Sequence, residues 1–408
     1  MTGVMRMRGV FGYHEFFWSG HADRFDDSRS LAILEGLERY AGLRPRGPEN
    51  QVIDSFANLG EVALDPRNCG VYSDDYYSDR SYHRRFDEQK PMRWVWGHSL
   101  RDERPVLLPE QIVYYGSGIL GGHETFVMEC SNGCATGSCP EEAVFFGLLE
   151  LIERDAFLLC WYGRAGLPEI DPATCMSTDT RIMIDLVGHM GYDVRLFDNR
   201  IDLPIPVVTA VAVRRDGGLG TLCFAAGASL DPEDAVRAAL CEVASYVPDF
   251  DRRTESDLAE ARAMAGDFGK VHELRHHALL YGLPEMRHHA DFLLGNQAPP
   301  LSMVQTYAGW EAQRPRNLDL LDDVAYLSGL LSGRGFDVIV VDQTSREQRA
   351  EGVSTHCVVV PGLLPIDFGW DRQRARHMSR TRTAFRDAPR WARELDVSEL
   401  HCAPHPFP

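Results

Sequence analysis

Apolar and polar residues recur at helical spacing in three long segments of this chain. The first, DDSRSLAILEGLERYAG, opens with acidic residues and predicts a helix near residues 28–42. The second, PEEAVFFGLLELIERDAFLLCWY, predicts a helix over residues 140–162 that is apolar enough to be central, with Ser138 or Cys139 at its cap. The third, DPEDAVRAALCEVASYV, predicts a helix within residues 228–247.

Alternating or continuous apolar runs predict strands between and after these helices. The clearest are DVRLFD, PVVTAVAVRR and GTLCFAAGAS, and later STHCVVV, while residues 318–344 read as helix, glycine turn and strand. Residues 252–300, rich in histidine and charge, are expected to be helical and to lie at the surface. Because no linker separates these elements, we expect an α/β fold in which residues 1–408 form one compact domain.

Composition narrows the class of protein. With 408 residues, 44% hydrophobic and 25% charged, the chain is an ordinary globular sequence. No run of roughly 18 to 20 apolar residues and no signal peptide is visible, so we expect a soluble, cytoplasmic protein with no membrane partner. The formal charge of -18 argues against nucleic acid as a partner. Ten cysteines without a CxxC pair are expected to be reduced thiols.

Glutamates recur on the first two predicted helices. Residues three apart share a helix face, so Glu35 lies near Glu38, and Glu150 near Glu153. Glu142 precedes Glu153 by about three turns and falls on the same stripe. Neighbouring arginines would neutralise these carboxylates, and so would Mg2+, which takes one or two carboxylates together with phosphate oxygens. The spacing alone leaves both interpretations open.

The segment CSNGCATGSCPEE precedes the second glutamate helix. Its small residues and glycines stand at a helix N-terminus, where backbone N–H groups bind anions such as phosphate. The segment matches neither the P-loop nor the dinucleotide fingerprint, and its cysteine spacing is not that of a zinc site. Beside the glutamate stripe, it indicates a site for a metal-bound nucleotide.

These motifs together resemble the YcaO family of ATP-dependent enzymes. The resemblance rests on SNGCATGSCPEEAVFFGLLELIERDAF, on the earlier LEGLERY, on GASLDPEDAVRAALCEV, and on VVVPGLLPIDFG with the ending PHPFP. It implies binding of ATP and Mg2+ between the two ExxER helices. In the azoline-forming branch, a Cys, Ser or Thr side chain of a ribosomal precursor peptide attacks the preceding carbonyl, whose oxygen is phosphorylated before phosphate leaves and a thiazoline or oxazoline ring closes.

The resemblance also implies roles for individual residues. Metal ligands carried over by motif are Glu38, Glu142, Glu150, Glu153 and Glu242. ATP-binding residues carried over are Glu35, Glu38, Arg39, Ser131, Asn132, Ser138, Arg154 and Arg237. The tail residues Pro404, Pro406 and Pro408 resemble the family's PxPxP ending, which enters the active site as an extended backbone.

The chain departs from the family pattern at three places. Relatives commonly carry asparagine where this chain has Ser138, and a lysine before the first helix where SGHADRFDDSRS has none. An arginine commonly falls one turn before the glutamate of the third helix, whereas Arg237 precedes Glu242 by five residues. These departures keep open a catalytically silent scaffold as one alternative function; backbone thioamide or amidine formation is another.

The expected partners follow from the same resemblance. No leader-binding or E1-like domain is evident, since only about 30 residues precede the first ExxER helix, fewer than such a module needs. We therefore expect a separate leader-binding or E1-like partner protein that delivers the precursor peptide, with a flavin-dependent azoline oxidase as a further partner. The family favours a homodimer or a complex with that partner.

Overall fold

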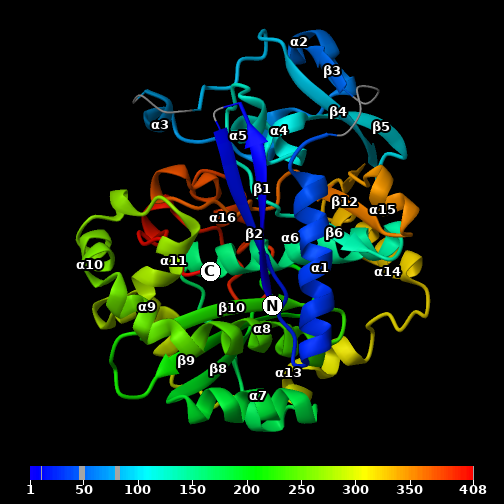
Figure 1. Ribbon diagram of the computed structural model, residues 1–408. Helices are drawn as coiled ribbons and strands as arrows, with labels where there is room; N and C mark the ends of the chain where they lie inside the picture. The colour runs from blue at the N-terminus through cyan, green and yellow to red at the C-terminus, as the bar shows by residue number, and fades with distance from the viewer. Residues whose placement is uncertain (11, 46–50, 79–82, 408) are drawn as a thin grey trace. The chain divides into compact units, whose positions relative to one another are not determined.

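The computed structural model describes residues 1–10, 12–45, 51–78 and 83–407, which fall into two compact units (Figure 1). The first unit comprises Met1–Leu151 and Pro315–Asp367, and the second comprises Ile152–Arg314 and Phe368–Pro408. Helices and strands are mixed in both units, which confirms the predicted α/β class, and every pairing between the named strands is antiparallel. Across the described ranges, no helix has the length and apolar character needed to cross a membrane.

The first unit contains a hairpin, a sheet and helix α1. The hairpin of β1 (Thr2–Gly9) and β2 (Gly12–Ser19) leads into α1 (Phe25–Gly42), which is longer than the predicted helix by three residues at its start. The sheet has the order β3-β4-β11-β12-β6, with β5 paired to β4. Its strands are β3 (Gln51–Asp54), β4 (Met92–Ser99), β5 (Arg104–Pro109), β6 (Cys134–Gly137), β11 (Ile339–Asp342) and β12 (Ser354–Val359).

Shorter helices complete the first unit around this sheet. They include α2 (Phe56–Leu59), α3 (Asp74–Ser78), α4 (Glu110–Val113), α5 (Ser117–Gly121), α14 (Leu320–Ser332) and α15 (Arg346–Ala350). The core joins residues far apart in sequence, because Val95 and Leu108 pack in one apolar cluster with Ile339 and Cys357. Strands β11 and β12, which come late in the sequence, therefore help to stabilise the unit that contains α1.

Helix α6 (Pro140–Tyr162) has the bounds that its sequence predicted. The Cys139 carbonyl accepts the first bond of the helix, from the Ala143 N–H at 3.3 Å, and Pro140 stands at the first position, where an N–H is not needed. Leu148, Ile152 and Leu158 are all buried. The helix begins in the first unit and continues into the second.

The second unit is built on a four-stranded sheet. Its order is β10-β9-β8-β7, with β7 (Glu169–Ile170), β8 (Tyr192–Asp198), β9 (Val207–Arg214) and β10 (Leu222–Ala228). Helix α8 (Pro232–Tyr246) packs against β9 and β10, and α7 (Thr178–His189) packs against α8 and β8 (Figure 1). The other helices include α9 (Phe250–Ser256), α10 (Leu258–Gly266), α11 (Leu274–Tyr281), α12 (Asp291–Leu294), α13 (Met303–Glu311) and α16 (Arg380–Thr383).

A buried ion network fixes the C-terminal half of α6 within the second unit. Arg380 donates to both carboxylate oxygens of Asp155 at 2.6 and 2.5 Å, and to both oxygens of Asp202 at 3.0 Å. Asp155 is only 1% exposed. The Arg380 guanidinium is thus shared between two buried carboxylates.

Replacing Arg380 with glutamine is expected to lower the free energy of unfolding by roughly 3–5 kcal/mol, because it removes a guanidinium that bonds two buried carboxylates. Urea denaturation measures this loss, with Arg386→Gln as the control, since Arg386 pairs with Asp387 at the exposed surface. Equal stability of the two variants would contradict the assignment of the network as a structural anchor.

Candidate active site

Helix α1 places its two glutamates and their arginine on one partly buried face. Glu35 accepts the Ser19 N–H at 2.8 Å and pairs with the Arg39 guanidinium at 2.7 Å. Glu38 lies 3.4 Å from the same arginine and is only 14% exposed. Glu35 therefore pairs closely with Arg39, whereas the contact of Glu38 with the same guanidinium is long. The roles predicted for both glutamates stay predictions.

The SNG turn packs closely against α6, the second glutamate helix. Gly133 adopts a φ of +80°, and a Cβ there would meet the Val358 carbonyl at 2.3 Å, so glycine is required. Gly147 of α6 approaches the same turn, since its Cβ would meet the Gly133 carbonyl at 2.7 Å. This close approach lets the Gly133 N–H donate to the Glu150 carboxylate at 2.8 Å. The turn and one predicted metal ligand thus form a single unit.

Asn132, in this turn, has a side-chain hydrogen-bond acceptor that no described residue satisfies. Its side-chain oxygen is buried and finds no hydrogen-bond partner among the described residues. Buried polar atoms are nearly always satisfied, so such an atom indicates a missing donor or cation. Ser131 lies beside it, and its carbonyl accepts the Cys134 N–H at 2.8 Å to close the turn. The predicted nucleotide turn is therefore shaped around an acceptor that a ligand can satisfy.

Ser138 binds the first glutamate of α6. Its backbone N–H and its hydroxyl both donate to one oxygen of Glu142, each at 2.6 Å. The serine that replaces the family's asparagine therefore holds the Glu142 side chain in place. The other oxygen of Glu142 is not used by this contact.

Glu153 and Arg154 form a pair in the second unit, with 3.2 Å between the carboxylate and the guanidinium. The Arg154 guanidinium lies 4.0 Å from the centre of the Phe407 ring, which also meets the ring of Phe157 edge-on at 4.8 Å. Cation–π contact of this kind is worth about 0.5–2 kcal/mol. The sequence motif predicts a role only for the prolines of the tail. In the structure, the residue that contacts the ExxER motif is Phe407, which lies between two of these prolines.

Side chains of the second unit bond the backbone carbonyls of the tail. The Trp161 indole donates to the Ala403 carbonyl at 3.0 Å, and the Tyr281 hydroxyl donates to the Pro404 carbonyl at 2.6 Å. His277 bonds the His405 carbonyl at 2.8 Å. Pro404 and Pro406 are buried with this segment, and Pro408 lies outside the described residues. The tail is thus an integral part of the second unit rather than a free end.

Helix α8 carries the remaining two predicted site residues. Arg237 pairs with Asp234 at 3.2 Å, and both side chains are well exposed. Glu242 lies five residues further on, about 140° around the helix, so the two side chains leave different faces. The roles predicted for both residues stay predictions.

In the first unit, the carboxyl group of Glu38 has a raised pKa. Burial raises the pKa of its carboxyl well above the ordinary value of 4.5; Arg39 opposes this shift, and the nearby carboxylates of Glu150 and Glu35 add to it. A divalent cation would relieve the repulsion between Glu38 and Glu150. Within the described part of the chain no three His, Cys, Asp or Glu side chains gather as a metal site by themselves.

Glu38→Gln is expected to stabilise the metal-free protein more at pH 8 than at pH 5. Between the ordinary pKa of 4.5 and the raised folded pKa, the folded protein holds a proton that the unfolded chain has released, so rising pH lowers the free energy of unfolding. The Glu38→Gln amide removes this loss of stability, and each 1 kcal/mol recovered raises the Tm by roughly 1 °C for a chain of 408 residues. Thermal unfolding in EDTA tests this, and a Tm difference that does not change with pH would contradict it.

All ten cysteines are free thiols. Burial, with the Glu129 carboxylate adding to it, raises the pKa of Cys130 to about 12, so this thiol stays protonated beside the SNG turn.

Comparison with known proteins places these features in a family. The family model for YcaO cyclodehydratases, described as ATP- and Mg2+-binding, matches residues 19–364. An uncharacterized protein of Methanothermobacter thermautotrophicus is 30% identical over 253 residues, which cover 60% of this chain and 61% of the relative. The chain thus spans about three-fifths of that relative's length.

Two solved structures share the fold. A heterocyclase in complex with substrate and cofactor superposes with a TM-score of 0.77 and 25% identity, over 97% of this chain but only 50% of the heterocyclase. YcaO from Methanopyrus kandleri, bound with AMPPCP and Mg2+, gives a TM-score of 0.59 at 23% identity, over 89% of this chain and 82% of that one. The glutamate helices, the SNG turn and the match over most of its length identify this chain as a member of the YcaO cyclodehydratase family.

Proposed function

We propose that the chain is an ATP-dependent cyclodehydratase that converts Cys, Ser or Thr of a ribosomal precursor peptide into thiazoline or oxazoline rings. The observation that carries this proposal is the contact of Phe407 with Arg154 beside Glu153, because it brings the tail against the ExxER motif. The family match and the similarity to a heterocyclase bound to its substrate support the same reaction class.

In this proposal the side chain of Cys, Ser or Thr attacks the preceding carbonyl carbon and loses its proton. ATP, bound with Mg2+, supplies the phosphoryl group that turns the former carbonyl oxygen into a leaving group. The attack itself closes the five-membered ring. Loss of phosphate and of the amide proton then forms the C=N bond of the azoline, so each ring removes one water from the peptide and converts one ATP to ADP and phosphate.

The residues of the chain position the reactants and balance charge. Glu38, Glu142 and Glu150 are the proposed metal ligands of the first unit, and Glu153 and Glu242 those of the second. Ser138 orients the Glu142 carboxylate, and the Gly133 N–H orients the Glu150 carboxylate. Both carboxylates are therefore already ordered before the substrate binds. Arg39, Arg154 and Arg237 are the proposed partners of phosphate oxygens. Glu35, Ser131 and Asn132 are proposed to contact the nucleotide.

We propose that a separate leader-binding or E1-like protein presents the precursor peptide, that a flavin-dependent oxidase acts on the rings afterwards, and that the chain works as a homodimer or in complex with its partner. The family match and the similarity to a heterocyclase bound to its substrate motivate the proposal of a partner.

The test is a reconstituted reaction with precursor, partner, ATP and Mg2+. We expect phosphate release and a peptide mass lower by one water for each ring. A mass rise characteristic of sulfur replacing oxygen would instead establish thioamide formation. Ring formation without ATP consumption, or no change in either quantity, would refute the proposal.

A further inference from the structure

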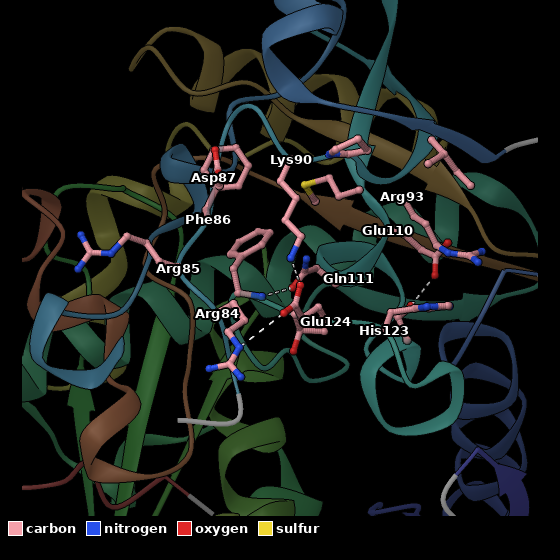
Figure 2. A pocket seen from close by; sticks show the side chains of 16 residues that line it. Arg84, Arg85, Phe86, Asp87, Lys90, Arg93, Glu110, Gln111, His123 and Glu124 are labelled. Atoms are coloured by element: carbon pink, nitrogen blue, oxygen red, sulfur yellow. Dashed lines mark hydrogen bonds and ion pairs between the residues drawn. The ribbon is translucent and has the colours of Figure 1, made fainter. Parts of the chain in front are cut away.

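The first unit contains a cavity of about 260 Å³ that is separate from the glutamate helices (Figure 2). Its wall is formed by β3, β4 and α4 and by the loops on either side of them. None of the proposed metal or nucleotide ligands lines it. The cavity therefore needs an explanation of its own.

One side of the cavity is apolar. Phe86 and Phe126 lie with ring centres 5.6 Å apart, and Met92 lines the same space. At the rim, Ile53 is 65% exposed and stands opposite Arg93 across the β3–β4 ladder. Such a surface gains free energy by covering an apolar side chain, at about 25 cal/mol for each Å² removed from water.

The inner corner is polar, and its charges are unequally satisfied. Glu110 is only 4% exposed, and its two oxygens accept from the Ser117 hydroxyl and the Gln51 amide, both at 2.8 Å. Arg93, beside it in Figure 2, donates one long bond of 3.4 Å to the Gln51 side chain. Across the described ranges it has no carboxylate within ion-pair distance. A guanidinium has five donors, so most of those of Arg93 remain available to a ligand.

The outer rim adds positive charge. Arg84 and Lys90 share one carboxylate, that of Glu124, and Figure 2 shows both reaching it. Arg85 also lines the cavity and pairs with Asp74. Four cations line the cavity together with the three carboxylates of Asp87, Glu110 and Glu124, so the lining has a small excess of positive charge in a chain of formal charge -18. This excess, together with the available donors of Arg93, favours an anionic ligand.

We propose that this cavity binds an extended peptide segment of a partner polypeptide in which a carboxylate neighbours an apolar side chain. The carboxylate pairs with Arg93, in the fork geometry that guanidinium and carboxylate share. The apolar side chain covers Phe86, Met92 and Phe126. Arg84 and Lys90 are more than half exposed, so a chain that leaves the cavity passes between them. Binding is independent of the reaction proposed above, so either proposal can fail alone.

The probe is a fluorescein-labelled, acetylated hexapeptide of alternating Leu and Glu, with the Leu and Gln hexapeptide as its uncharged counterpart. Fluorescence anisotropy is expected to give saturable binding of the acidic peptide to the full chain. The Gln counterpart and the variant Arg93→Gln should each weaken binding by about tenfold or more, the loss of one charge-assisted pair.

Two further variants keep this test independent of folding defects. Ile53→Glu adds a carboxylate at the exposed rim opposite Arg93 and is expected to weaken binding of the probe to a similar degree. Arg104→Gln is the matched control, because Arg104 is 47% exposed on β5 and does not line the cavity. It should change the Kd by less than about twofold.

Three outcomes would overturn the proposal. They are the absence of saturable binding to the unmodified chain, equal affinity of the unmodified chain and Arg93→Gln, and displacement of the probe by ATP, which would place the peptide at the nucleotide site.

Discussion

Glu150→Gln is expected to lower ATP-dependent ring formation by about 100-fold or more. The carboxylate accepts the Gly133 N–H and lies near Glu38, so it is the point where the SNG turn and both glutamate helices of the first unit meet. A neutral amide of the same size keeps the shape and removes the negative charge that Mg2+ requires. Phosphate release and peptide mass, measured on the same samples, give the size of the effect.

Glu141→Gln is the matched control for this prediction. Glu141 lies on the same helix nine residues earlier, on the opposite side from Glu150, and is not among the proposed ligands. We expect it to retain turnover within about threefold, since isolated surface charges contribute little. Full activity of both Glu150→Gln and Glu153→Gln would exclude the glutamate stripe as the metal site.

Phe407→Ala is expected to slow ring formation by about tenfold or more and to raise the KM for ATP. The ring is 2% exposed and packs on Arg154 and Phe157, so its loss frees the tail from the ExxER motif and lets the arginine move. Because Phe407 contacts Arg154, a proposed partner of phosphate oxygens, it is a positioning residue. The effect should therefore appear in both kcat and the KM for ATP.

Phe407→Tyr separates positioning from simple packing. An aromatic ring that retains cation–π contact should restore most of the rate. Val397→Ala is the control for general disturbance of the C-terminal region, since Val397 is 64% exposed. If Phe407→Ala matched the unmodified chain in kcat, the tail would have no part in the proposed active site.

Helices with strong periodicity were predictable from the sequence. The second glutamate helix has its predicted bounds because Cys139, Pro140 and the apolar stripe are local signals. The β1–β2 hairpin and strands β3 to β5 were not predicted. Strand β6 lies where a glycine-rich turn was expected, since CATG carries no strand signal and pairs with β12 only through the fold. β-strands depend on the neighbour that they find, and that neighbour follows by more than two hundred residues.

The sequence by itself determined the spacing of the glutamates, the SNG turn and the membership of a family, because residues three apart on a helix share a face wherever the helix lies. Only the tertiary structure decided how these groups are used. In the folded chain, Gly133 donates a hydrogen bond to Glu150, Ser138 donates one to Glu142, and the Phe407 ring packs on Arg154. Such contacts depend on close packing between segments that are far apart in the sequence. The local spacing of apolar residues does not determine which of these segments will meet.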